Sequence, residues 1–154
     1  MGWNPQIAIA VFIGLTATVE DVLRREIPNW IPVTALIGGA SASVWLGGWS
    51  GLGSSLLGAL LGFLVFLLFY AMGGMGGGDV KLMAGLGAVL GAGRILEAAL
   101  WTAGIGGVIA ALAVGYGALR RRPAGGRPDT KSRMHIPYAP AITLGAWLAL
   151  VPNG

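Results

Sequence analysis

Six apolar stretches, separated by short polar or glycine-rich connections, run along the chain. They cover residues 6–19, 31–46, 52–70, 80–90, 95–119 and 138–151. Such stretches predict membrane helices, although a perpendicular crossing takes about 20 apolar residues and several of these are shorter. The shortest, 80–90, has 11 residues, or about 16 Å of helix. It fits either a re-entrant segment or a crossing that continues through Gly91 and Arg94 in a thinned bilayer.

The composition supports a membrane location. Of the 154 residues, 55% are hydrophobic and 10% are charged, whereas a soluble domain carries about 25% charged residues. The chain contains no cysteine, which excludes disulfides, a thiolate zinc site and a thiol nucleophile. Aspartate, serine and histidine chemistry remain open, and we expect no metal and no cofactor.

The basic residues predict the topology. Nine of the ten follow the first, third and fifth stretches, namely Arg24, Arg25, Lys81, Arg120, Arg121, Arg122, Arg127, Lys131 and Arg133. With six crossings these connections share one face, and only Arg94 lies opposite. If 80–90 did not cross, the clusters at 24–25 and 120–122 would lie on opposite faces, against the positive-inside rule. The same rule explains the net charge of +4 without nucleic acid as a partner.

The predicted fold is therefore an all-α integral membrane protein with six transmembrane helices. Both termini are expected to be extracytoplasmic and the three basic loops cytoplasmic. The first 20 residues contain no Lys or Arg, so we expect a retained first helix instead of a cleaved signal peptide. Residues 1–154 are expected to form a single membrane-embedded domain in the cytoplasmic membrane.

Small residues predict where helices approach closely in lipid. Two GxxxG pairs, Gly58 with Gly62 and Gly87 with Gly91, are expected to form helix contacts, as are three further glycines in the fifth stretch, Gly104, Gly107 and Gly115. Most of the six tryptophans lie near the predicted segment ends, where we expect them to act as interfacial anchors.

Asp21 lies at the end of the first stretch, before Arg24 and Arg25. We expect it to be helical, because Pro28 ends a helix at or near Ile27. A carboxylate at this depth is costly and therefore a candidate functional group. Taken alone, Asp21 fits equally well an interfacial carboxylate paired with one of the two arginines.

Asp79 follows a run that is all glycine except for Met75, residues 73–78. Such a run cannot stay helical cheaply, and Asp79 then occupies the predicted N-cap position of the next helix. Capping alone explains an aspartate at that position equally well. The run lacks the G-x-x-x-x-G-K-[ST] spacing of a phosphate-binding loop, which argues against nucleotide binding.

The two aspartates become more informative as a pair. They are 58 positions apart, and the two predicted crossings between them return the chain to the same face. Two carboxyl groups a few ångströms apart share a proton, which leaves an acid beside a base. In an aspartic-protease dyad, one group activates water and the other protonates the scissile amide.

Three motifs carry a resemblance to a known family. Gly76-Gly77-Gly78-Asp79 resembles the GxGD motif of intramembrane aspartyl proteases. Its extension through Lys81, the earlier Asp21 with Ile27-Pro28-Asn29, and the late Ile136-Pro137-Tyr138-Ala139-Pro140 resemble type IV prepilin peptidases. The resemblance covers nearly the whole chain.

The resemblance implies that Asp21 and Asp79 are the catalytic pair. It also implies that supporting motif or substrate-loop residues are Gly76, Gly78, Lys81, Pro28, Asn29 and Pro137. The implied substrate is a prepilin or pseudopilin whose short basic leader is removed at the cytoplasmic membrane face. Larger members carry an extra region with four cysteines and also methylate the new N-terminus. This chain has no cysteine, so we expect neither zinc nor methylation. Its size resembles that of the minimal Flp or tad-type prepilin peptidases.

Several neighbouring residues allow two interpretations. Lys81 either favours the ionised form of Asp79 or marks the cytoplasmic face. Glu20 and Glu26 either attract a basic leader or solvate the helix end. His135, the only histidine, is expected to be an interfacial residue instead of a ligand, and the loop at 120–133 is expected to contact anionic lipid.

The competing function is a proton-coupled membrane transport component, because paired intramembrane acids also relay protons. Both acids, however, are predicted near one face instead of the midplane, and no inverted repeat is evident. A noncatalytic assembly subunit is a third hypothesis, and for it substitution of either aspartate would be silent. The oligomeric state cannot be predicted from the sequence.

Overall fold

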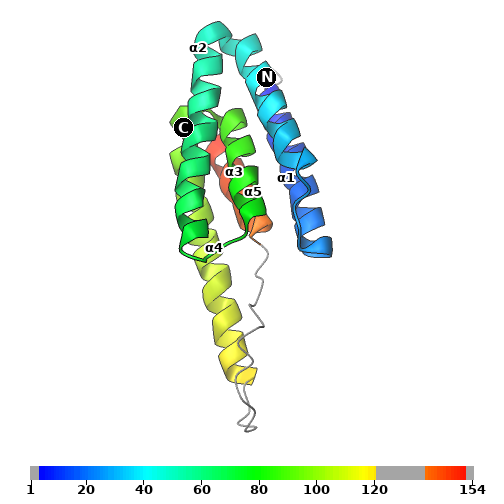
Figure 1. The fold of residues 1–154 in the computed structure, drawn as a ribbon, viewed down its shortest axis with the longest axis vertical. Helices are drawn as coiled ribbons and strands as arrows, with labels where there is room; N and C mark the ends of the chain where they lie inside the picture. The colour runs from blue at the N-terminus through cyan, green and yellow to red at the C-terminus, as the bar shows by residue number, and fades with distance from the viewer. Residues whose placement is uncertain (1–3, 121–137, 152–154) are drawn as a thin grey trace.

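The computed structural model describes residues 4–120 and 138–151, and these form helices joined by short loops (Figure 1). The helices are α1 (Pro5–Arg24), α2 (Trp30–Ala71), α3 (Gly77–Leu90), α4 (Ala92–Arg120) and α5 (Ala139–Leu150). Within α2 the backbone breaks at Gly48, whose φ of 58° and ψ of −140° are not helical. Counting the two halves of α2 separately, each helical segment in this part of the chain overlaps one of the predicted apolar stretches.

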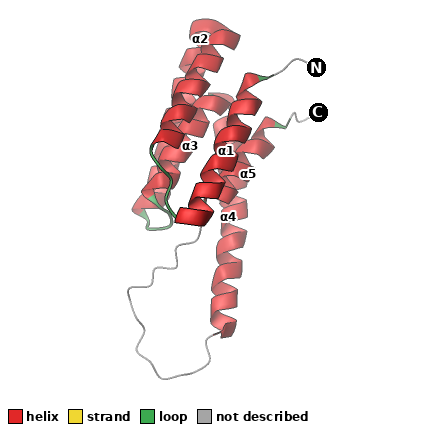
Figure 2. Cartoon of the chain, turned by 90° about the vertical axis from the view of Figure 1, so that its right-hand side faces the viewer, coloured by secondary structure: helices red, strands yellow, loops and turns green. Residues whose placement is uncertain are grey.

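The segments run alternately in opposite directions (Figures 1 and 2). The chain descends through α1, returns along the first half of α2, reverses at Gly48, and descends again before α3 rises, α4 descends and α5 rises. As a result α1 begins and α5 ends at the end of the bundle where α2 turns. Arg24, the loop at 72–76 and Ala139 lie at the opposite end, which is called the site end below.

Three of the described helices are long and apolar enough to cross a membrane: α1, α2 and the 92–112 portion of α4. Many large apolar side chains on their surfaces are exposed, with Trp45 and Trp49 at 86% and 88%. Exposing such apolar surfaces to water costs free energy, whereas contact with lipid does not. The described part of the chain is thus all-helical, and the protein is a membrane protein.

Helix α3 lies at the centre of the bundle and contacts each of the other four helices. Its 14 residues span about 21 Å, and most of them are buried, including Leu82, Met83 and Leu86 at 0% exposure. The helix ends at Leu90, and Gly91 with a φ of 73° turns the chain directly into α4. The 80–90 stretch therefore does not continue as one helix through Gly91 and Arg94; Arg94 belongs to the first turn of α4.

Glycines allow α2 to approach α3 closely. A methyl group on Gly58 would collide with the carbonyl oxygen of Gly87 and with the backbone of Gly91, and one on Gly62 would lie 2.6 Å from the carbonyl oxygen of Met83. The predicted contact role of the two GxxxG pairs is confirmed. By allowing this approach, the glycines fix the position of α3 and of the aspartate that it carries.

One of the packing expectations is wrong. A methyl group added to Gly104, Gly107 or Gly115 of α4 would meet no described atom within 4 Å, so these glycines do not mediate contacts within this part of the chain. The indole N–H of Trp147 donates to the carbonyl oxygen of Ala10, 3.1 Å away. Trp147 therefore joins α5 to α1, and its expected role as an interfacial anchor stays a prediction.

Candidate active site

Asp21 is positioned by the last turn of α1 and the first residue of α5. Its side chain is buried, with 7% exposure, and its Oδ2 accepts a hydrogen bond of 3.0 Å from the backbone N–H of Ala139. Helix α1 ends at Arg24 because Arg25 adopts a left-handed φ of 57°. Asp21 is helical, as predicted, but the helix ends three residues before Ile27. The proline at position 28 therefore does not set this boundary.

Arg24 does not pair with Asp21, which is the partner that the sequence suggested. Its Nε lies 3.2 Å from Oε2 of Glu20, one turn earlier. The hydrogen bond of the Asp21 carboxylate instead comes from a backbone amide at the N-terminus of α5, where the helix dipole favours negative charge. The simple pairing of Asp21 with Arg24 is thus not what the geometry shows.

Asp79 lies in the first turn of α3, but not at the position that was predicted. Gly76 is the N-cap residue, and Asp79 stands three residues later. The Oδ2 of Asp79 accepts from the backbone N–H of Gly76 at 3.0 Å, while its own N–H donates to the carbonyl oxygen of Gly76 at 3.2 Å. The carboxylate therefore binds back to the helix N-terminus as the acidic member of a capping box does. Its burial equals that of Asp21, with 7% exposure.

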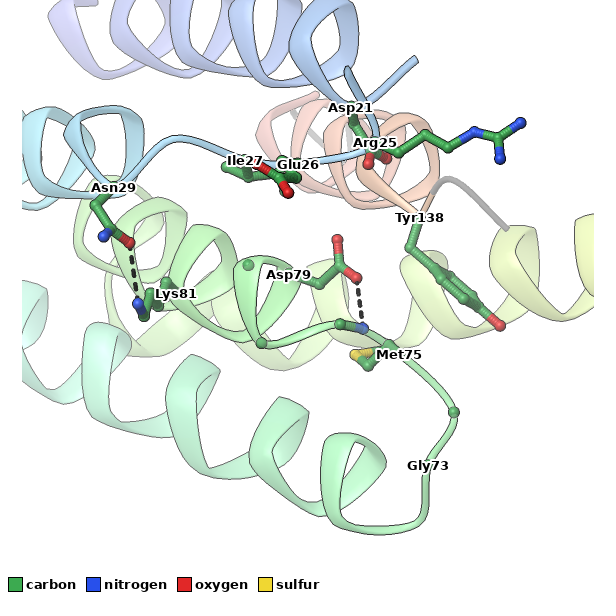
Figure 3. Close-up of a pocket in the computed structure, with 14 residues that line it drawn as sticks. Asp21, Arg25, Glu26, Ile27, Asn29, Gly73, Met75, Asp79, Lys81 and Tyr138 are labelled. Carbon is green, nitrogen blue, oxygen red and sulfur yellow. Dashed lines mark hydrogen bonds between the residues drawn. The ribbon is translucent and has the colours of Figure 1, made fainter. Parts of the chain in front are cut away.

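The two carboxyl groups face one pocket at the site end of the bundle. In Figure 3 they point toward one another across it, Asp21 from α1 and Asp79 from α3. The pocket encloses about 750 Å³ and is lined by Asp21, Arg25, Glu26, Ile27, Asn29, Gly73, Gly74, Met75, Gly76, Gly77, Gly78, Asp79, Lys81 and Tyr138. Asp21 and Asp79 were predicted from the sequence as the catalytic pair, whereas no role in the site was predicted for Arg25, Met75 or Tyr138.

Most of the predicted supporting residues surround this pocket. Gly76, Gly78, Lys81 and Asn29 line it, whereas Pro28 does not, although both of its neighbours do. Ile27 lies against Gly78 and leaves little room for a side chain there, because an added methyl group would be 3.2 Å from the Ile27 Cβ. Pro137, like His135 and the 121–133 part of the basic loop, lies outside the described residues.

Lys81 makes a contact that neither of its predicted roles includes. Its Nζ donates a hydrogen bond of 2.9 Å to Oδ1 of Asn29 (Figure 3). Asn29 precedes α2 and makes no side-chain cap bond to that helix. The contact therefore links the α1–α2 connection to α3 on one side of the pocket.

The site has no described grouping suited to a metal. Among residues 4–120 and 138–151, no three His, Cys, Asp or Glu side chains gather so that they could hold an ion. What the pocket does offer is two buried carboxyl groups, each held by a backbone amide. The fold and the site together define a class: helical membrane proteins with a pair of aspartates at one end of the bundle.

Comparison with known proteins gives the family within that class. Residues 8–111 match the model of the type IV leader peptidase family, and the chain belongs to this family. It is 37% identical over 145 residues to the prepilin leader peptidase/N-methyltransferase of Bacillus subtilis (strain 168), covering 90% of this chain and 53% of that protein. The Aeromonas salmonicida (strain A449) protein of the same name is 31% identical over 158 residues, covering 97% and 50%.

A more distant similarity is to the preflagellin peptidase of Methanococcus voltae, 31% identical over 86 residues, with 54% of this chain and 37% of that protein covered. The chain spans about half the length of the bacterial relatives named above. No solved structure matches it. The Flp or tad subtype is not distinguished by these relatives and stays a prediction.

Proposed function

We propose that this protein is an aspartyl endopeptidase that removes the leader from prepilins or pseudopilins. The observation that carries the proposal is the convergence of Asp21 and Asp79 on one pocket, although they are 58 positions apart in the chain. Membership of the type IV leader peptidase family and the names of the relatives support the choice of substrate.

In this proposal the two carboxyl groups share one proton. The ionised group removes a proton from a water molecule, which attacks the carbonyl carbon of the scissile peptide. The protonated group donates a hydrogen bond to the carbonyl oxygen and then supplies the proton that the leaving amine requires. The amides of Gly76 and Ala139 hold the two side chains in place during these steps, and the steps as proposed use no cofactor.

We further propose that the site end faces the cytoplasm and that the six helical segments all cross the cytoplasmic membrane as one domain, residues 1–154. Arg24, Arg25 and Lys81 lie at the site end, whereas Arg94 belongs to the first turn of α4 at the other end. This distribution is the one that the positive-inside rule favours. A short basic leader would meet Glu26 and the two aspartates in the pocket, and lipid would surround the exposed apolar faces.

The test is co-expression with a prepilin, followed by N-terminal sequencing of the product. Asp21→Asn and Asp79→Asn keep the side-chain shape but remove the base, so each should reduce cleavage by at least about a hundredfold. Glu97→Gln makes the same chemical change in α4, outside the pocket, and should leave cleavage intact. Full cleavage by Asp79→Asn, with the protein present in the membrane, would exclude this mechanism.

A further inference from the structure

Four hydrogen bonds between described residues join α1 to α5, which lie side by side (Figure 2). The bond from the Ala139 amide to Asp21 is the one at the pocket. One turn deeper, the hydroxyl of Thr143 in α5 donates to the carbonyl oxygen of Gly14 in α1, 3.1 Å away. The same hydroxyl lies 3.1 Å from that of Thr18. The indole bond described above completes the line toward the other end of the bundle.

Thr18 and Thr143 bond differently from the other threonines of the described helices. Each of those others donates to the carbonyl oxygen four residues earlier in its own helix, and they are Thr16, Thr34 and Thr102. This is the local bond that a hydroxyl inside a helix commonly makes. For Thr18 the equivalent acceptor would be Gly14, but Thr143 donates to that carbonyl from the neighbouring helix. The two hydroxyls therefore link α1 to α5 instead of serving their own helices.

The link fixes the height of α5 against α1. A threonine hydroxyl has one hydrogen, and that of Thr143 goes to Gly14, so Thr18 is the donor in the contact between the two hydroxyls. Thr143 is buried, with 3% exposure, and a methyl group added to Gly14 would lie 2.5 Å from its Cγ2. Because one residue of helix rises about 1.5 Å, a slip of α5 by a single residue would break both bonds.

We propose that Thr18 and Thr143 are positioning residues for Asp21. This inference rests on the proposed peptidase function. By holding α5 in place, the two hydroxyls keep the Ala139 amide 3.0 Å from Oδ2 of Asp21, and so keep the carboxylate at one point in the pocket. Neither threonine lines that pocket, so both act through Asp21 and not on the substrate. A catalytic group that is misplaced by 1 Å can cost about a hundredfold in rate.

Removal of single hydroxyls tests this role. Thr18→Val and Thr143→Val keep the branched side chain and lose the hydroxyl, whereas Thr18→Ser and Thr143→Ser keep the hydroxyl. Thr16→Val is the matched control, because the Thr16 hydroxyl donates within α1 and the residue lies outside the pocket. The measurement is kcat and KM for cleavage of a prepilin in detergent, with each rate divided by the amount of folded protein.

Valine at position 18 or 143 is expected to lower kcat roughly tenfold, since the proposed base is displaced. The KM should stay within about twofold of the wild-type value, because no residue of the pocket is changed. Serine at either position should restore most of kcat, and Thr16→Val should match the wild type. An unchanged kcat for the folded protein would mean that the hydroxyls only stabilise the bundle, and would overturn the inference. A loss that serine shares with valine would overturn it as well.

Hydrogen exchange of the Ala139 amide separates this inference from the peptidase proposal, because it requires no cleavage. Exchange should be several-fold faster in Thr18→Val and Thr143→Val than in Thr16→Val, since the start of α5 then opens more readily. Faster exchange in the valine variants, with no cleavage by the wild type, would retain the positioning contact and reject the peptidase. Equal exchange in all three variants would overturn the positioning role whether or not the wild type cleaves.

Thr18→Val also covers the case in which Thr143→Val does not fold. It retains the bond from Thr143 to Gly14 and removes only the second hydroxyl, so it is the milder change. Its exchange rate and its kcat, each compared with those of Thr16→Val, then decide the inference alone.

Discussion

The carboxylate of Asp21 accepts a hydrogen bond from the backbone amide of Ala139, 3.0 Å away, so the first and last described helices meet at one of the two candidate catalytic groups. Tyr138, the N-cap residue of α5, makes no side-chain cap bond of its own. The Asp21 carboxylate, 118 positions away in the chain, therefore accepts the hydrogen bond of the Ala139 amide. At most helix N-termini a capping side chain close in sequence accepts such a bond. Asp21 consequently has a structural role in addition to the proposed chemical one.

Two substitutions should separate these roles of Asp21. The side-chain carbonyl of Asp21→Asn can still accept from Ala139, whereas Asp21→Ala leaves that buried amide without its partner. We expect Asp21→Ala to lower the free energy of unfolding by about 1 kcal/mol more than Asp21→Asn, the usual size of a lost cap. Denaturant unfolding in detergent, followed by circular dichroism, measures the difference. Equal unfolding midpoints would contradict the capping role, and both variants should fail to cleave.

The hydrogen bond between Lys81 and Asn29 should appear as coupling between the two residues. Lys81→Met and Asn29→Ala are each expected to lower kcat/KM several-fold, because each releases the α1–α2 connection from α3. The double variant should be no worse than the more affected single variant, since both remove the same contact. Fully additive losses would show that the two residues act separately.

The approach of α2 to α3 predicts which glycines tolerate a methyl group. Gly58→Ala places its Cβ against the backbone of Gly87 and Gly91, and should cost about 1–3 kcal/mol, as overpacking does. Gly53→Ala lies in the same half of α2 with no described atom within 4 Å of the added methyl group. It should be tolerated. Thermal unfolding in detergent measures both variants, and equal midpoints would refute the close contact.

Single cysteines should establish the topology, because the natural chain has none. We expect cysteines in place of Trp49 and Arg94 to react with an impermeant maleimide added to intact spheroplasts. Cysteines in place of Arg24 and Lys81 should react only after permeabilisation. All four side chains are exposed, so accessibility within the protein is matched. Labelling of 24 and 94 from the same side would refute the six-crossing arrangement.

Much of the architecture was predictable because it depends on local composition. Apolar stretches bounded by polar or glycine-rich connections identified every helical segment of the described chain. The balance of basic residues predicted that Asp21 and Asp79 would lie at the same end. The glycine pairs of α2 and α3 were correctly identified as contacts, since close packing in lipid demands small residues.

The remaining features depend on contacts that a single sequence does not encode in a visible pattern. The bond from Ala139 to Asp21 uses a backbone amide, which every residue but proline carries. Asp79 stands at the third helical position instead of the cap because Gly76 already provides the extended N-cap backbone. Gly104 and Gly107 are spaced like contact glycines, yet their neighbours depend on how α4 is rotated. Lys81 was considered only for its charge, although its reach to Asn29 fixes a loop.

The burial of α3 limits how this scaffold can be varied. A residue change on a helix enclosed by four others disturbs packing on several sides at once, and here it would also displace Asp79. Libraries aimed at new cleavage preferences should therefore leave α3 and its N-cap Gly76 untouched and diversify the open face of α4. Those positions can accept new side chains while Asp21 and Asp79 keep their places.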